Sequence, residues 1–160
     1  MDRIDAPDFR TLSRDEIAAV LRRNHVGRIA FAWRDRVDIQ PIHYVFAGGW
    51  IYGRTAPGAK LTAVSHNRWV AFEVDEVEEM FAWRNVVVHG AFHVLSPEGP
   101  EHERAAWQRG VELVQRIVPA AFQDHDPVPF RTVLFRIAVQ EASGREARPA
   151  RPAALQALAG

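Results

Sequence analysis

Six runs rich in β-branched and aromatic residues restrict the fold of this chain more than any other feature. They cover residues 28–33, 37–46, 50–54, 68–77, 85–95 and 132–140. Such runs favour β-strands, because branched and aromatic side chains pack well on a pleated surface. Asp35 and Arg36 lie between the first two runs, and Gly48 and Gly49 precede the third; connections this short are typical of hairpins. The sequence therefore predicts an antiparallel sheet of six strands, with Pro41 on an edge strand because proline has no N–H to donate.

Two longer segments carry helical signals. Ser13 and Glu16 form a capping-box pattern that predicts a helix over about residues 14–24, and Gly27 lies where a left-handed C-cap residue is expected. A second helix is predicted over residues 99–118, where apolar residues recur at spacings of three and four: Trp107, Val111, Val114 and Val118. Strands combined with flanking helices predict an α+β fold built on an antiparallel barrel.

Length and composition favour one domain. The chain has 160 residues, of which 48% are hydrophobic, and this is enough to bury a core. We expect the core over about residues 12–142, and a tail or subunit arm over the proline-rich residues 143–160. Lys and Arg number 20 and Asp and Glu also number 20, so neither nucleic acid nor a membrane is expected as a partner. The chain has no cysteine, no leader pattern and no apolar run that could span a bilayer, so a cytoplasmic protein is expected.

One connection, residues 53–67, has a composition that suits a phosphate site. Its small residues would let backbone N–H groups approach a ligand, and a short helix starting near Pro57 would direct its N-terminal dipole to the same place. The connection also supplies basic and hydroxyl donors: Arg54, Thr55, Lys60 and Thr62. The same residues are compatible with an ordinary strand-to-helix turn in which Lys60 is solvated. The spacing alone favours the ordinary turn, because the segment matches neither a Walker A motif nor Gly-x-Gly-x-x-Gly.

Histidines offer a weaker hypothesis. His89 and His93 are four residues apart on a predicted strand and therefore share one face, where His43 or His66 could join them around a metal ion. Surface histidines are much more common than metal ligands, and no supporting carboxylate is evident in the sequence. We therefore expect no metal site.

The order of these elements resembles a known family. Residues 27–30 (GRIA), 40–44 (QPIHY), 53–67, 65–75 and 83–95 occur in an order similar to that of the pyridoxamine 5'-phosphate oxidase-like, FMN-binding split-barrel superfamily. The most similar branch is that of flavin-nucleotide-binding proteins, which includes the nitroimidazole-resistance type. The resemblance covers about residues 12–95, with a further similarity over residues 135–146. It implies a six-stranded antiparallel split barrel that forms a homodimer, with two FMN sites shared between the subunits.

The resemblance also implies which residues bind the cofactor. Residues that would lie along the isoalloxazine ring are Ile39, Gln40, Pro41, Ile42 and Tyr44. Residues that would hold the FMN phosphate are Arg54, Thr55, Gly58 and Lys60. Residues that would reach the flavin of the partner subunit are Asn85 and Val86. No catalytic residue is assigned, because hydride and electron transfer belong to the flavin itself.

Departures from the family pattern limit the predicted activity. Residues 145–160 contain no tryptophan, whereas the vitamin oxidase has a C-terminal tryptophan, so that activity is not expected. Arg54, Thr55 and Ala56 stand where the nitroimidazole-resistance branch has His-Gly-Ala, which leaves nitroreduction open and is also compatible with a more anionic deazaflavin. The expected function is an FMN-dependent oxidoreductase that passes hydride or electrons between a reduced nicotinamide cofactor and a small acceptor. The alternatives are a non-catalytic flavin carrier or sensor, a deazaflavin-binding reductase and a cofactor-free dimeric interaction module.

Overall fold

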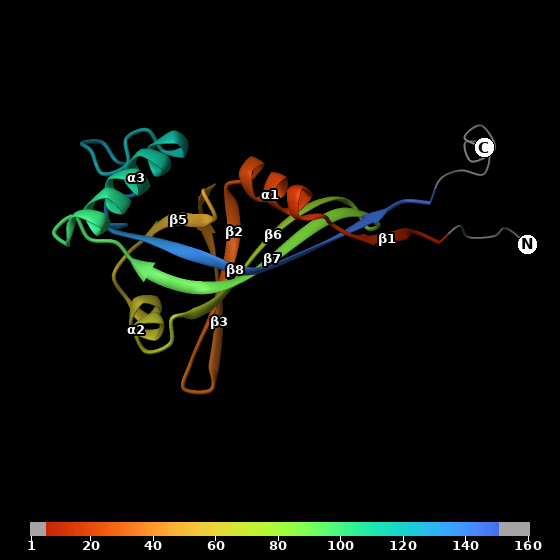
Figure 1. The fold of residues 1–160 in the computed structure, drawn as a ribbon, viewed down its shortest axis with the longest axis horizontal. Helices are drawn as coiled ribbons and strands as arrows, with labels where there is room; N and C mark the ends of the chain where they lie inside the picture. Colours follow the sequence, from red (N-terminus) through yellow and green to blue (C-terminus); the bar gives the residue numbers. More distant parts are fainter. Residues whose placement is uncertain (1–5, 151–160) are drawn as a thin grey trace, which may run out of the picture.

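The computed structural model describes residues 6–150, which form an antiparallel sheet and three helices (Figure 1). The strands are β1 (Asp8–Thr11), β2 (Val26–Trp33), β3 (Arg36–His43), β4 (Val45–Ala47), β5 (Trp50–Thr55), β6 (Trp69–Glu79), β7 (Ala82–Val94) and β8 (Val133–Arg148). The helices are α1 (Arg14–Arg23), α2 (Ala59–His66) and α3 (Glu101–Ile117). The predicted α+β class and antiparallel pairing are confirmed, whereas the described residues form eight strands and not six.

Two differences account for the strand count. Strand β1 was not predicted, because its four residues, Asp-Phe-Arg-Thr, carry no strand pattern. The predicted run 37–46 is interrupted at Tyr44, which separates β3 from β4. Tyr44 is fully buried, and its hydroxyl donates a hydrogen bond to the carbonyl oxygen of Leu21 on α1 at 2.8 Å. This bond holds α1 against the point where the chain passes from one strand to the next.

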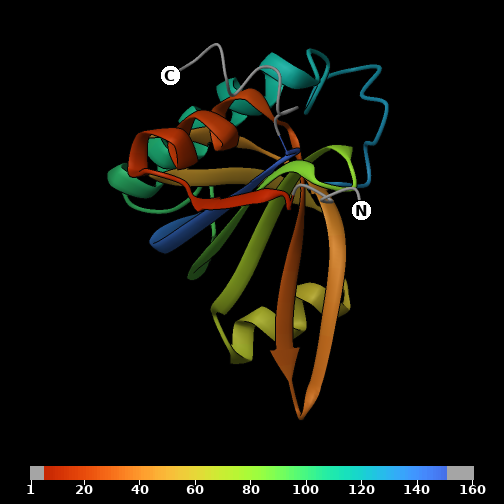
Figure 2. The same ribbon diagram turned by 90° about the vertical axis from the view of Figure 1, so that its right-hand side faces the viewer.

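Strand β8 connects the two ends of the sheet, whose order is β3-β2-β6-β7-β8-β5-β4 with β1 beside β8. One edge of β8 pairs with β7 along most of its length, while the other edge pairs first with β5 and then with β1. The β2–β3 hairpin crosses the long β7 and β8 strands in both ribbon views (Figure 2). Residues 143–148, which were predicted to belong to a tail or subunit arm, form the end of β8, and residues 151–160 lie outside the described residues.

Local turn chemistry explains the connections. The predicted glycine turn is confirmed, since Gly48 and Gly49 have φ values of 59° and 81°. The β2–β3 turn is formed by Arg34 and Asp35, both with positive φ, one position earlier than expected. The predicted C-cap at Gly27 is wrong, because α1 ends at Arg23 and Gly27 is part of β2. The capping box is confirmed: the Glu16 N–H donates to Ser13 Oγ at 3.2 Å, and the Ser13 N–H donates to Glu16 Oε1 at 3.0 Å.

The sheet separates two apolar clusters. The larger cluster fills the barrel and includes Ile29, Phe72, Phe135 and Ile137. The smaller one lies between α3 and the outer face of β4, β5 and β8, around Tyr52, Leu113 and Leu134. Helix α3 therefore covers one outer face of the sheet, and the segment that follows it returns past β5 to reach β8. None of the three helices in the described part of the chain is long and apolar enough to cross a membrane.

Candidate functional site

A pocket of about 250 Å³ lies where β3, β5 and α2 meet, and we call it the Lys60 pocket. The polar side chains that line it are Gln40, His43, Arg54, Thr55, Lys60 and Arg131. Within the described residues, no carboxylate lines this pocket. The pocket therefore collects positive charge without the acidic groups that usually balance it.

Lys60 is the most informative residue of the pocket. Its side chain comes from the first turn of α2, and the residue is only 8% exposed. Its Nζ donates to Thr55 Oγ1 at 3.2 Å, and it forms no ion pair with any described residue. Burial lowers the pKa of the Lys60 ammonium, and the nearby charge of Arg131 lowers that pKa further. A buried ammonium with one neutral partner is unfavourable unless a ligand supplies the counter-charge.

Arg131 adds a second cation that sequence reasoning did not single out. It lies just before β8, and its Nη1 is 3.5 Å from His43 Nδ1. Among the described residues, it forms no ion pair with a carboxylate. The only sequence signal was a basic residue next to a predicted strand, and that signal is too common to indicate a site. The fold brings Arg131 and Lys60 to the same pocket, although they are 71 positions apart in the sequence.

The start of α2 also favours an anion. The helix begins at Ala59, two residues later than predicted, and its N-cap residue is Gly58. No side chain caps this end, and the first turn contains no acidic residue. No atom lies within 4 Å of the position that a Gly58 Cβ would occupy, so the approach to the helix end is open. Free N–H groups at a helix start attract negative charge, and here they lie beside the buried ammonium of Lys60.

Arg54 lines the pocket, but its charge is already balanced. Its Nη1 and Nη2 donate to the Asp126 carboxylate at 2.5 Å and 2.9 Å, and both side chains are 5% exposed. Asp126 also accepts the N–H groups of Phe122 and Val128, so it fixes the loop between α3 and β8. The Arg54 guanidinium holds the pKa of the Asp126 carboxyl well below its usual range. Arg54 is therefore a fixed wall of the pocket, and Lys60 and Arg131 carry its unbalanced charge.

The predicted ring-binding stretch divides between two faces of β3. Gln40, Pro41 and Ile42 line the Lys60 pocket, and their contact with the isoalloxazine ring stays a prediction. Ile39 lies on the opposite face of the strand and is 64% exposed. Tyr44 does not line the pocket, because its side chain is buried in the core.

Asn85 and Val86 lie on β7 and do not line the Lys60 pocket of the same chain. Val86 is fully buried in the barrel core, so its side chain is directed inward. Asn85 lies between Asp75 and Arg145 in the sheet, on the face opposite to the core. Contact of Asn85 with the flavin of a partner subunit stays a prediction.

Two further pockets adjoin the Lys60 pocket. The hairpin pocket, of about 400 Å³, lies between the β2–β3 hairpin and α2, and it shares Gln40 with the Lys60 pocket. The α3 pocket, of about 250 Å³, lies under the end of α3, and it shares His43, Arg54 and Arg131 with the Lys60 pocket. The Lys60 pocket is therefore the middle one of three pockets in a row.

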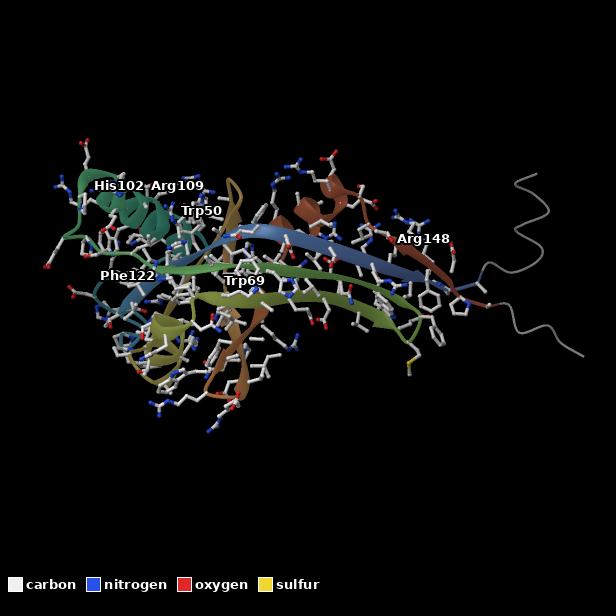
Figure 3. The ribbon with its side chains drawn as sticks, turned by 60° about the horizontal axis from the view of Figure 1, so that its bottom comes forward. Trp50, Trp69, His102, Arg109, Phe122 and Arg148 are labelled. Atoms are coloured by element: carbon white, nitrogen blue, oxygen red, sulfur yellow. The ribbon has the colours of Figure 1, made fainter. Side chains whose placement is uncertain are left out.

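The candidate metal residues are engaged with aromatic side chains. The His89 ring stacks on Trp69, with 6.5 Å between the ring centroids, and Trp69 lies on the outer face of the sheet (Figure 3). The His93 ring meets Trp50 edge to face at 6.1 Å. Within residues 6–150, no cluster of three His, Cys, Asp or Glu side chains could hold a metal ion.

The chain is similar in sequence to a known family and to a curated protein. The sequence model of the family described as pyridoxamine 5'-phosphate oxidase matches residues 13–146. The uncharacterized protein RA0666 of Rhizobium meliloti (strain 1021) is 32% identical over 100 residues, which are 61% of this chain and 66% of that protein. The match therefore spans just under two thirds of that relative's length.

Two solved structures of proteins described as FAD-binding share the fold. The protein mll6688 from Mesorhizobium loti is 27% identical, with a TM-score of 0.71 over 89% of this chain and 98% of its own. The protein from Mycobacterium smegmatis is 25% identical, with a TM-score of 0.61 over 86% of this chain and 98% of its own.

Proposed function

The chain belongs to the pyridoxamine 5'-phosphate oxidase family of split-barrel proteins, and from this premise we propose that it binds a flavin by its phosphate in the Lys60 pocket. The observation that carries the proposal is the buried Lys60 ammonium, which has a hydroxyl and no carboxylate as its partner in the described structure. A phosphate supplies the negative charge that this ammonium lacks.

The residues present fit a flavin phosphate. Lys60, Arg131 and the Thr55 hydroxyl would hold the phosphate, together with the N–H groups at the start of α2. Gln40 and Ile42, which face the same pocket from β3, would lie along the rest of the flavin. When bound, the flavin supplies hydride or electron transfer. The chain binds and orients the flavin and shields its phosphate from water.

We further propose an oxidoreductase that passes hydride or electrons between a reduced nicotinamide cofactor and a small acceptor. Family membership supports this activity, and the polar lining of the Lys60 pocket suits cofactor binding without a nucleophile or a pair of carboxylates. FMN is the flavin that the sequence resemblance implied. The two FAD-binding relatives also support FAD.

The test starts with the visible absorbance spectrum of the purified protein, followed by titration with FMN, FAD and a deazaflavin. We expect saturable binding near one flavin per chain and oxidation of reduced nicotinamide when an acceptor is added. Flavin binding without turnover would contradict the oxidoreductase and leave a flavin carrier or sensor. Absence of binding to all three would contradict the flavin site and leave an interaction module.

A further inference from the structure

The α3 pocket, of about 250 Å³, is not part of the proposed flavin site. Most of its wall is apolar and comes from the end of α3 and from the connection between α3 and β8: Val114, Ile117, Val118, Pro127 and Val128. Its polar lining residues are His43, Arg54 and Arg131, and no carboxylate among residues 6–150 lines it. We propose that the α3 pocket is a second ligand site, which binds a small monocarboxylate with an apolar tail. Binding of this ligand does not require a flavin.

The apolar wall fits a short hydrocarbon tail. Val114 is only 3% exposed, and Ile117 and Val118 pack against the same apolar cluster beneath α3. A tail that covers this wall is removed from water, which is favourable in proportion to the apolar area buried. Drug-sized ligands need pockets of about 300–1,000 Å³, so the ligand of this pocket is smaller than these.

The charged part of the α3 pocket fits one carboxylate. His43, Arg54 and Arg131 line both this pocket and the Lys60 pocket, so they form the wall between the two. Arg54 is already paired with Asp126. Arg131 forms no ion pair with a carboxylate of the described residues, and its Nη1 is 3.5 Å from His43 Nδ1. A guanidinium binds a carboxylate through two parallel hydrogen bonds, so Arg131 would hold the head of the ligand while its tail extends toward α3.

The connection between α3 and β8 forms the outer wall of the pocket before a ligand binds. Residues 118–132 contain no helix or strand, and connections of this length are uncommon unless they serve a function. The Asp126 carboxylate accepts the N–H groups of Phe122 and Val128. The Arg131 N–H donates to the Val128 carbonyl oxygen at 3.0 Å, which fixes the backbone of the arginine to that wall. A wall that is already in place reduces the entropy lost on binding.

Two other classes of ligand use only half of the pocket. A neutral hydrocarbon would fill the apolar part and leave the Arg131 guanidinium without a counter-charge. An inorganic anion would pair with Arg131 and leave the apolar wall uncovered. A monocarboxylate with an apolar tail matches both parts.

NMR titration of the purified full-length protein with three small probes tests the class of ligand. Hexanoate has both a carboxylate and a tail, hexanamide has the tail with a neutral head, and acetate has the carboxylate without the tail. We expect hexanoate to bind at least about tenfold more tightly than either of the others. Hexanamide that binds as tightly as hexanoate would overturn the charged contact, and acetate that does so would overturn the apolar one.

Replacement of Arg131 tests the carboxylate contact. Arg131→Gln should weaken hexanoate by about tenfold or more and leave hexanamide within about twofold, because only the charged head loses its partner. Arg116→Gln is the matched control, since Arg116 is an exposed cation in the last turn of α3 and lines none of the three pockets. Equal weakening of hexanoate by both substitutions would show an effect of net charge and overturn the contact.

Filling the pocket tests the position of the tail. Val118→Phe and Val128→Phe each place a ring in the α3 pocket, from different walls, and each should weaken hexanoate by about tenfold or more. Val94→Phe should change nothing, because Val94 is 56% exposed and lines none of the three pockets. The melting temperature of each variant shows whether it folds. Unchanged hexanoate affinity in a folded variant of either kind would overturn the site.

Lys60→Ala separates this site from the flavin site. Lys60 does not line the α3 pocket, so Lys60→Ala should leave hexanoate affinity within about threefold. Weakening of hexanoate by Lys60→Ala as large as that by Arg131→Gln would place the carboxylate in the Lys60 pocket and overturn the second site. Absence of FMN binding with hexanoate binding intact would contradict the proposed function alone.

Discussion

Lys60 has the clearest single-residue consequence in this structure. Lys60→Ala should weaken FMN binding by about 1.5–3 kcal/mol, because a charge-assisted hydrogen bond to the phosphate is lost. Isothermal titration measures this change directly. Arg104→Ala is the matched control, since Arg104 is an exposed cation on α3 and lines none of the three pockets. Equal effects of the two substitutions would show that Lys60 acts only through net charge.

The lowered pKa of Lys60 predicts how flavin affinity depends on pH. Burial and Arg131 both disfavour the ammonium, so the free protein loses the Lys60 proton at a lower pH than an exposed lysine does. A phosphate binds the protonated form. Affinity should therefore fall as the pH rises toward the ordinary lysine pKa of about 10.4, and this slope should be absent in Lys60→Ala. A slope that persists in Lys60→Ala would assign it to another group.

Asp126 should matter for stability as well as for the shape of the site. Its pKa is held low by Arg54, so the pair stabilises the fold at neutral pH, and this contribution is lost as the pH falls below about 4. Asp126→Asn should lower the melting temperature at pH 7 by about 10 °C, because Arg54 is left buried without a counter-charge.

The control for this prediction replaces the whole pair. Arg54→Met combined with Asp126→Leu removes both charges and should recover most of the lost melting temperature. Two results would contradict the proposed contribution of the pair to stability. One is a melting temperature of Asp126→Asn equal to that of the wild type, and the other is a melting temperature of the double variant below that of Asp126→Asn.

Residue identities in the site were only partly predictable from sequence. Thr55 and Lys60 are close in the chain and have a recognisable order of residue types, so their meeting in one pocket could be predicted. Asp126 and Arg131 lie in an irregular loop, with no periodicity to indicate which way their side chains point. Arg54 and Asp126 are 72 positions apart, so only the folded chain shows that this arginine is already paired.

At the level of elements, Gly27 provides a test of why a glycine is present. A Cβ at Gly27 would lie 2.3 Å from the ring of Phe72 and 2.9 Å from the Glu73 carbonyl oxygen. Phe72 is 1% exposed and packs edge to face on Tyr44, so its ring has little room to move. Gly27→Ala should therefore destabilise the fold by about 1–3 kcal/mol in urea unfolding, as overpacking does.

Gly58→Ala is the matched control for that substitution. Nothing lies within 4 Å of its added methyl group, and its φ of 161° is extended backbone that alanine adopts. It should leave the stability close to that of the wild type. A stable Gly27→Ala variant would mean that β2 and β6 can separate enough to admit a methyl group.

Strands could be predicted from the sequence where their apolar residues are buried in the core. All six predicted runs contain strand, because their apolar residues pack in the barrel. The end of β8 was missed because residues 140–143, Gln-Glu-Ala-Ser, are exposed and carry no alternation of buried apolar side chains. The break at Tyr44 was missed because it depends on a hydrogen bond to α1, which no local pattern records.

At the level of the whole molecule, we propose a homodimer formed by the outer face of the sheet, with flavin sites shared between subunits. Exposed apolar side chains on this face include Val37, Ile39 and Trp69. Asn85 faces the same side, where it could reach a partner's flavin.

The order of the elements alone identified the family, because that order reflects the whole fold. Subunit contacts leave no comparable pattern in one sequence.

Dilution tests the shared sites. Analytical ultracentrifugation measures the protein concentrations at which the dimer dissociates. Flavin should be released over the same range of concentrations. Ile39→Glu should shift this transition to higher concentration by at least about tenfold, because it places a charge in an apolar contact. Val94→Glu is the control, because Val94 lies at the end of β7 and is 56% exposed, against 64% for Ile39. Monomers that retain flavin with unchanged affinity would contradict sharing.

Comparison of FMN with riboflavin tests most directly whether Lys60 binds the phosphate of a flavin, because riboflavin lacks only that phosphate. The affinities of both ligands are measured by isothermal titration for the wild type and for Lys60→Ala. The wild type should prefer FMN by about 100-fold, and Lys60→Ala should lose at least about tenfold of that preference. Equal affinities of the wild type for riboflavin and FMN would contradict the phosphate site.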